Sequence, residues 1–171
     1  DRGRLRDLPS DDLAAEMYFA TQEITEAAGM PAYEISNHAR PGSESWHNQI
    51  YWRYGDYAGV GPGAHGRLTL PIGRVSTETA RAPGAWLNAP GAFAQEALPP
   101  EAPAEEYAMM ALRLAEGVDE TRYAALAGKP FAAAVVADLE EQGLVSRNAG
   151  YLLATKKGRP ILNALLRALL A

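Results

Sequence analysis

The sequence predicts an α+β fold made of two parts, and three observations support that prediction. Apolar residues recur at helical spacing in both halves of the chain, alternating segments bounded by turn residues lie between them, and a proline-rich stretch divides the halves near Pro99-Pro100. The chain has 171 residues, 47% of them hydrophobic, which is enough to build a core. We expect the first part to span residues 1–97 and the second residues 98–171.

The first part should open with an amphipathic helix, because its apolar residues follow three- and four-residue steps: Leu13, Met17, Ala20, Ile24 and Ala27. Ser10 or Asp11 can cap its start, and Gly29 can end it in a left-handed turn. Residues 32–36, "AYEIS", are typical of a short buried strand. Residues 36–55 indicate an irregular loop rich in polar and aromatic side chains.

Glycines punctuate residues 56–66, "DYAGVGPGAHG", which predicts a strand end that turns tightly. Residues 66–80 alternate around Pro71-Ile72-Gly73 and predict a hairpin. Residues 81–103 indicate short helical turns followed by a linker.

The second part should contain three helices, a hairpin and a closing helix. The first helix places apolar residues on one face before a stop at Gly117: Tyr107, Met110, Ala111 and Leu114. The second helix covers 119–127, and the third covers 130–142 with three residues inward: Phe131, Val135 and Leu139. Residues 144–155 form the hairpin around Asn148-Ala149-Gly150. The last helix starts at Thr155 or Pro160 and turns four residues inward: Leu162, Leu165, Leu166 and Leu169. This order predicts a winged-helix-like domain.

Composition limits the classes of function. The net charge is −5, with +3 in residues 129–171 and −8 before them, so nucleic acid is not an expected partner. No stretch of about 18 consecutive apolar residues occurs, so we expect no membrane span. The sequence has no cysteine and does not open with a basic segment followed by an apolar one, as a signal peptide does, so we expect a cytoplasmic protein. Because the first residue is Asp1, we expect the chain to be a fragment of a longer protein.

Chemically capable side chains gather in residues 33–66, which hold all three histidines, four of the eight tyrosines and two of the three tryptophans. In "GVGPGAHG", residues 59–66, four glycines alternate with other residues. They indicate either a backbone that a flat ligand approaches closely or a tight turn where strand packs on helix, and the spacing leaves both open. The pattern lacks the helix and lysine of a phosphate-binding loop.

The run "SWHNQIYW" has two interpretations. Aromatic faces can cover a flat apolar ligand, and imidazole is a good iron or zinc ligand, so His47, Tyr51 and Trp52 are candidates for ligand binding. The same residues could also be an aromatic loop folded onto the rest of the chain. A zinc site built from all three histidines is a further alternative, although nothing in their spacing enforces convergence. Glu34 and Asp56 could serve as acid or base, but their separation does not indicate a pair.

The runs "YEISN", "HNQIYW" and "GVGPGAHG" come in an order and spacing that closely resemble the oxygen-independent coproporphyrinogen III oxidase-like radical S-adenosylmethionine (SAM) proteins. Within that group the chain resembles the haem-chaperone, HemW-like branch, and the resemblance covers essentially all residues. It implies that residues 1–97 are the last α/β elements of a partial radical SAM barrel. It also implies that a missing first half carries a CxxxCxxC loop. In the family, the thiolates of this loop bind a [4Fe–4S] cluster, and SAM coordinates the iron that has no thiolate ligand.

The resemblance also implies site residues. The glycine-rich turn of the family lies near the adenine side of SAM, which assigns that role here to Gly61, Pro62, Gly63 and Ala64. The HNxxYW run is associated with haem, which assigns tetrapyrrole binding to His47, Asn48, Tyr51 and Trp52, with His47 as the haem-iron contact. The resemblance identifies no catalytic residue in this chain.

Two activities exist in the family. The chaperone branch binds haem and passes it to apo-proteins, and the HNxxYW run favours this function here. The oxidase branch decarboxylates coproporphyrinogen III, and it is the alternative. A third hypothesis reads the C-terminal part as a winged-helix module that binds DNA or a protein partner. The fragment alone should be catalytically inert, since it cannot bind the cluster. The sequence leaves the oligomeric state and the recipient apo-protein open.

Overall fold

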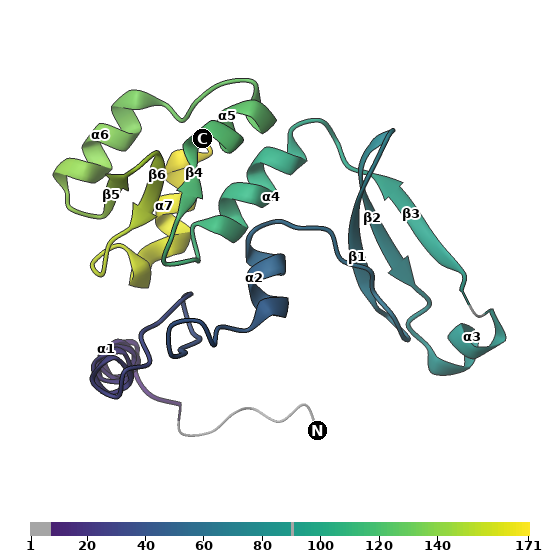
Figure 1. The fold of residues 1–171 in the computed structure, drawn as a ribbon, viewed down its shortest axis with the longest axis horizontal. Helices are drawn as coiled ribbons and strands as arrows, with labels where there is room; N and C mark the ends of the chain where they lie inside the picture. The colour runs from purple at the N-terminus through teal and green to yellow at the C-terminus, as the bar shows by residue number, and fades with distance from the viewer. Residues whose placement is uncertain (1–7, 90) are drawn as a thin grey trace. The chain divides into compact units, whose positions relative to one another are not determined.

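The computed structural model describes residues 8–89 and 91–171, and the chain divides into two compact units, residues 1–44 and 45–171 (Figure 1). The predicted α+β class is confirmed, because helices combine with two antiparallel three-stranded sheets in the described residues. The division expected at residue 98 stays a prediction. Across the described ranges, every helix is too short or too polar to cross a bilayer.

The first unit contains the predicted N-terminal helix, α1 (Asp11–Ala27). Ser10 is its N-cap, and the Ser10 hydroxyl accepts a hydrogen bond of 3.3 Å from the Leu13 amide. Gly29 follows the helix with a φ of 74°, as a left-handed stop requires. The predicted apolar stripe is present but not covered: Ile24 is 70% exposed, and no residue of α1 is buried.

The strand predicted at residues 32–36 is wrong. The segment is a bend closed by one isolated bridge between Ala32 and His38. The side chain of Glu34 is fully buried, and its Oε1 accepts hydrogen bonds from the amide (3.0 Å) and the hydroxyl (3.1 Å) of Ser36. This local side-chain contact satisfies the Ser36 amide in a conformation that competes with an extended strand.

The second unit starts with a helix, α2 (Trp46–Trp52), inside the segment predicted as an irregular loop. That prediction is wrong for this run because Ser45 caps it: the Ser45 hydroxyl accepts a hydrogen bond of 3.3 Å from the Asn48 amide. Seven residues are too few to show a clear helical period, so the pattern of apolar residues gave no signal.

The C-terminal end of α2 is a Schellman motif built around Tyr54. The Gly55 amide donates to the Ile50 carbonyl at 2.8 Å, and the Tyr54 amide donates to the Tyr51 carbonyl at 3.0 Å. Tyr54 therefore occupies the left-handed position, with a φ of 55°, where glycine is the usual residue. This conformation costs a side-chain-bearing residue roughly 1–2 kcal/mol, so other contacts must hold Tyr54 in place.

The first sheet has the order β1 (His65–Leu70), β2 (Gly73–Thr79) and β3 (Phe93–Ala97), all antiparallel. The predicted hairpin is confirmed, since Leu70 pairs with Gly73 across Pro71-Ile72. A short helix, α3 (Pro83–Asn88), matches the expected helical turn, whereas β3 lies where a linker was predicted. The edge strand β3 is exposed along its length, so it lacks the in-out alternation that identifies a strand in sequence.

The remaining elements follow the order predicted for a winged-helix-like domain, with sheet order β4-β6-β5 (Figure 1). They are α4 (Ala102–Ala111), β4 (Val118–Asp119), α5 (Glu120–Ala127), α6 (Ala133–Glu141), β5 (Val145–Asn148), β6 (Tyr151–Ala154), the 3-10 helix η1 (Arg159–Ile161) and α7 (Leu162–Leu169).

The core of this domain matches the sequence analysis in part. All four inward residues predicted for α7 are buried: Leu162, Leu165, Leu166 and Leu169. In α6 the fully buried valine is Val136, not the predicted Val135, because the helix begins at Ala133 rather than at residue 130. The β5–β6 turn has two residues, Ala149 (φ 49°) and Gly150 (φ 87°), instead of the predicted three.

A partly buried polar cluster joins α4 to the first sheet. The Tyr54 hydroxyl donates to Glu106 Oε2 at 2.7 Å, and Arg67 on β1 donates to the same carboxylate through Nη2 (3.0 Å) and Nε (3.3 Å). The guanidinium of Arg74 on β2 lies 3.7 Å from the centroid of the Tyr54 ring. These four residues, the Glu106 cluster, fix the left-handed Tyr54 and connect α2, β1, β2 and α4.

Electrostatics in this cluster favour an ionised Glu106. Burial alone raises the pKa of the Glu106 carboxyl, but the hydrogen bonds from Arg67 and Tyr54 outweigh burial, so the pKa lies below its ordinary value. For Tyr54, burial and the neighbouring Glu106 both raise the pKa, so the hydroxyl stays protonated as a donor. Because the pKa of Glu106 is lower in the folded state than in the unfolded state, where it is about 4.3, ionisation of Glu106 stabilises the fold at pH values above that unfolded-state pKa. This stabilisation is lost as the pH falls through the pKa of the folded state.

We expect Glu106→Gln to lower the free energy of unfolding at pH 7 by about 1–3 kcal/mol, since the Arg67 side chain would lose a charged partner in a site where the two side chains are only 24% and 19% exposed. The variant should also lose less stability than the parent chain between pH 5 and pH 3. Urea unfolding at several pH values measures both effects. Glu96→Gln on exposed β3 is the control, and equal stability of the two variants at pH 7 would contradict the assigned role of Glu106.

Candidate functional site

The HNxxYW run forms helix α2, which gives its side chains fixed relative positions. His47 and Tyr51 are four residues apart, so they lie on the same side of the helix, and Trp52 follows Tyr51 directly. The His47 side chain is exposed, whereas Asn48, Tyr51 and Trp52 are half-buried. The helix therefore presents an accessible imidazole beside partly packed rings.

The rings of α2 are held by contacts within the second unit. The centroids of Tyr51 and Trp52 lie 5.2 Å apart in a T-shaped arrangement, and Tyr51 also lies 5.2 Å from the Tyr57 ring. Burial raises the pKa of the Tyr57 hydroxyl, and the neighbouring Tyr51 raises it further. The guanidinium of Arg113 lies 5.5 Å from the centroid of the Trp52 ring. These contacts order the aromatic surface without covering it completely.

The three histidines lie in three different settings. His38 belongs to the first unit, and its Nε2 is buried with no hydrogen-bond partner among the described residues. His47 is on α2 and His65 begins β1, and both side chains are exposed. Within residues 8–89 and 91–171 no group of three or more histidine, aspartate or glutamate side chains is arranged to bind a metal ion, so the structure gives no support to the three-histidine zinc alternative.

Each glycine of "GVGPGAHG" has a reason within the fold. Gly61 and Gly63 have positive φ values of 110° and 68°. A Cβ atom on Gly59 would lie 2.3 Å from the His65 carbonyl oxygen, and one on Gly66 would lie 2.4 Å from Thr77 Oγ1. Of the two interpretations that the spacing left open, the tight, closely packed turn is therefore the one that the geometry accounts for directly.

The turn is fixed on the end of β2 and is open on one side. Thr79 Oγ1 donates to the Gly61 carbonyl and accepts from the Ala64 amide at 2.9 Å, and the Gly63 amide donates to the Ala80 carbonyl at 2.9 Å. A Cβ on Gly61 would meet no described atom within 4 Å. The turn thus leaves room for a group to approach Gly61 closely.

The acidic residues suggested as acid or base candidates have structural partners instead. Asp56 accepts hydrogen bonds from the amide (2.9 Å) and hydroxyl (2.8 Å) of Thr69 and from Arg74 (2.8 Å). Burial raises the pKa of the Asp56 carboxyl, but the hydrogen bonds from Thr69 and the positive charge of Arg74 together outweigh burial and lower the pKa below its ordinary value. Glu34 lies in the first unit, where its Oε1 accepts hydrogen bonds from the amide and the hydroxyl of Ser36. Glu106 and Arg113 could not be identified from the sequence, because the residues that they contact lie far away along the chain.

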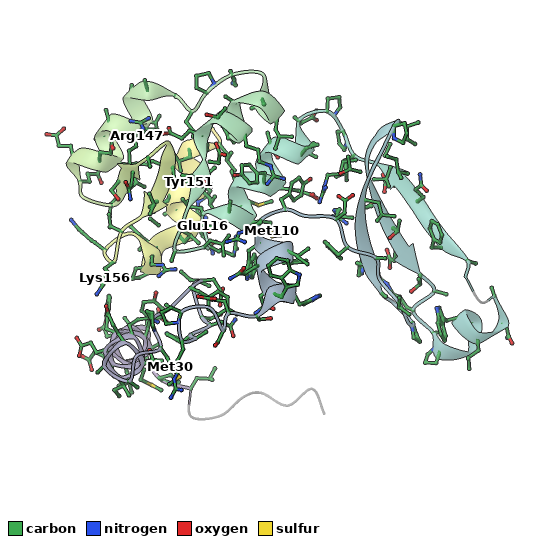
Figure 2. The ribbon with its side chains drawn as sticks, viewed as in Figure 1. Met30, Met110, Glu116, Arg147, Tyr151 and Lys156 are labelled. Atoms are coloured by element: carbon green, nitrogen blue, oxygen red, sulfur yellow. The ribbon has the colours of Figure 1, made fainter. Side chains whose placement is uncertain are left out.

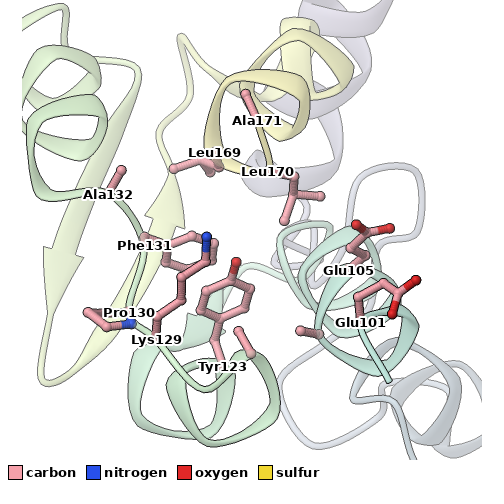
Figure 3. Close-up of a pocket in the computed structure, with 12 residues that line it drawn as sticks. Glu101, Glu105, Tyr123, Lys129, Pro130, Phe131, Ala132, Leu169, Leu170 and Ala171 are labelled. Carbon is pink, nitrogen blue, oxygen red and sulfur yellow. The ribbon is translucent and has the colours of Figure 1, made fainter. Parts of the chain in front are cut away.

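A separate hollow of about 280 Å³ lies in the winged-helix-like domain (Figure 3). Its wall includes Tyr123 and Phe131, whose rings stack with centroids 3.6 Å apart and planes at 11°. Lys129, Glu101 and Glu105 add charges of both signs around it. None of the site residues predicted from sequence lines this hollow.

The comparisons with known proteins agree with these motifs. Residues 98–161 match the family described as the HemN C-terminal domain. The protein named heme chaperone HemW from Escherichia coli (strain K12) is 34% identical over 173 residues, which cover 96% of this chain and 44% of that protein. Radical S-adenosyl methionine domain-containing protein 1, mitochondrial, from Bos taurus is 33% identical over 178 residues, which cover 95% of this chain and 40% of that protein. The chain thus spans less than half the length of these relatives.

A solved structure extends the match to the fold. Coproporphyrinogen III oxidase (HemN) from Escherichia coli, described as a radical SAM enzyme, has a TM-score of 0.67 over 97% of this chain and 43% of that chain, at 17% sequence identity. At that identity the likeness shows the fold alone. Because the sequence relatives, the C-terminal domain match and the fold agree, the chain belongs to the HemN/HemW family of radical SAM proteins, and it matches their C-terminal part.

Proposed function

We propose that the protein containing this chain binds haem and delivers it to apo-proteins. The observation that carries the proposal is α2, which sets an exposed His47 on the same side as the half-buried ring of Tyr51, with Trp52 beside it. An accessible imidazole can ligate haem iron, and adjacent aromatic rings can stack on the macrocycle. The amide of Asn48 would add polar contacts. Relatives named heme chaperone HemW support this function.

SAM and a [4Fe–4S] cluster are the cofactors that the family implies for the full-length protein. This chain has no cysteine, so the thiolate ligands of a cluster would come from residues outside it. The glycine-rich turn fits the adenosyl side of SAM, because Gly61 is open to close approach and Gly63 and Ala64 are small. Gly61, Pro62, Gly63 and Ala64 would position that group, whereas the bound cofactor would supply radical chemistry.

Coproporphyrinogen III oxidation is the second candidate function. Its support is the fold shared with HemN, which is described as a coproporphyrinogen III oxidase. Haem and coproporphyrinogen are both tetrapyrroles, so the aromatic surface of α2 suits either. An assay of activity must separate the two functions.

DNA binding has less support. Helix α6, in the position of a recognition helix, carries Asp138, Glu140 and Glu141 and no lysine or arginine. Arg147, next to the wing turn and labelled in Figure 2, forms ion pairs with Glu120 and Glu140, both at 3.0 Å. The module therefore suits a protein partner better than a duplex.

We expect His47→Ala in the full-length protein to raise the dissociation constant of haem at least tenfold, because an iron ligand would be lost. Titration of the Soret band measures the affinity, and its position reports the change of axial ligand. His65→Ala is the matched control, since His65 is also an exposed histidine of the second unit. An unchanged affinity and spectrum for His47→Ala would remove the assignment of His47 as the iron contact.

A chaperone and an oxidase also differ in their products. We expect the reconstituted full-length protein, supplied with SAM and a reductant, to form no protoporphyrinogen from coproporphyrinogen III while it transfers haem to an apo-protein. Chromatography of the porphyrins and the absorbance of the acceptor protein measure the two activities. Turnover of coproporphyrinogen III would instead establish the oxidase function.

A further inference from the structure

Arg113 lies just beyond the end of α4, with its guanidinium over the ring of Trp52, 5.5 Å from the ring centroid. We propose that Arg113 binds a propionate carboxylate of the haem that stacks on α2. The inference rests on the proposed function and goes further, since it assigns the recognition of the carboxylates of the cargo to a residue outside the HNxxYW run.

The pairing of the arginines favours this role. Five arginines of the second unit form ion pairs with carboxylates: Arg53, Arg67, Arg74, Arg81 and Arg147. Arg122 and Arg159 donate to backbone carbonyls. Arg113 is half-buried and has no carboxylate partner among the described residues, and only Nη1 of its side chain donates there, to the Met109 carbonyl of the preceding helix, α4. Most of its guanidinium donors are therefore available to a ligand.

The acid nearest to Arg113 in sequence does not compete for it. Glu116, labelled in Figure 2, accepts two hydrogen bonds from Arg53, at 2.7 and 2.8 Å. This bidentate pair neutralises Glu116 and leaves the positive charge of Arg113 beside the indole ring. A planar guanidinium recognises a carboxylate with two parallel hydrogen bonds, which suits a propionate of haem.

The backbone of Arg113 is fixed, so its side chain starts from a defined position. Leu112, the preceding residue, is fully buried. The Arg113 amide donates to the Met110 carbonyl at 3.1 Å, and the Arg113 carbonyl accepts from Arg159 at 3.2 Å. A preorganised cation loses little freedom on binding, which increases its contribution to affinity.

The test compares haem with haem dimethyl ester, which has the same iron and macrocycle but no free carboxylates. In the full-length protein, we expect Arg113→Met to weaken haem binding about tenfold or more and to leave the affinity for the ester unchanged. Arg113→Lys should restore part of the loss because it keeps the charge. Arg167→Met, which removes an exposed arginine on α7, is the matched control.

The outcomes are distinct. If Arg113→Met weakens binding of haem and ester equally, Arg113 only supports the Trp52 ring and the inference is overturned. It is also overturned if Arg113→Met binds haem as the parent protein does, although the proposed function then stands. If the parent protein binds neither ligand, the proposed function fails together with the inference.

Discussion

The carboxylate of Glu106 connects parts of the second unit that are far apart in sequence. It accepts hydrogen bonds from Tyr54, at the end of α2, and from Arg67, on β1. Arg74 on β2 packs over the Tyr54 ring and also binds Asp56. Together these contacts offset the cost of the left-handed Tyr54 and hold the Schellman motif that ends α2. With the bidentate Arg53–Glu116 pair, they connect the end of α2 to α4 and to the segment that follows it.

This cluster has consequences for both candidate motifs. The HNxxYW helix ends two residues before Tyr54, and the glycine-rich turn leads directly into β1, which carries Arg67. Thr79, at the end of β2, fixes the turn itself. A tetrapyrrole-binding helix and a cofactor-side turn would thus be positioned by one set of partly buried polar contacts, although neither motif contains Glu106. The proposed site would thus depend on a residue outside both motifs.

Sequence predicted the elements whose signals are local and repeated. The stripe of α1, the leucines of α7 and the two hairpins follow from helical spacing and turn residues, and all of them are present. The sequence did not predict α2 or the bend at Glu34, because single side-chain contacts from Ser45 and Glu34 decide them. The motifs identified the candidate residues, but not that His47 and Tyr51 share one side of a helix, nor that Arg113 meets a ring sixty-one positions away.

The charged residues of the winged-helix-like domain are placed differently from those of a DNA-binding winged helix. In a DNA-binding winged helix, basic side chains of the recognition helix and wing face the duplex. Here the recognition position is acidic, the arginine next to the wing turn is tied to Glu120 and Glu140, and Arg159 supports the backbone of Arg113. These two arginines thus serve contacts inside the protein, and a third, Arg113, lies over the ring of Trp52 on α2. A domain that orders this cation beside α2, the helix proposed to bind haem, would add carboxylate recognition to iron ligation. That combination would let the protein distinguish haem from an apolar macrocycle of the same shape.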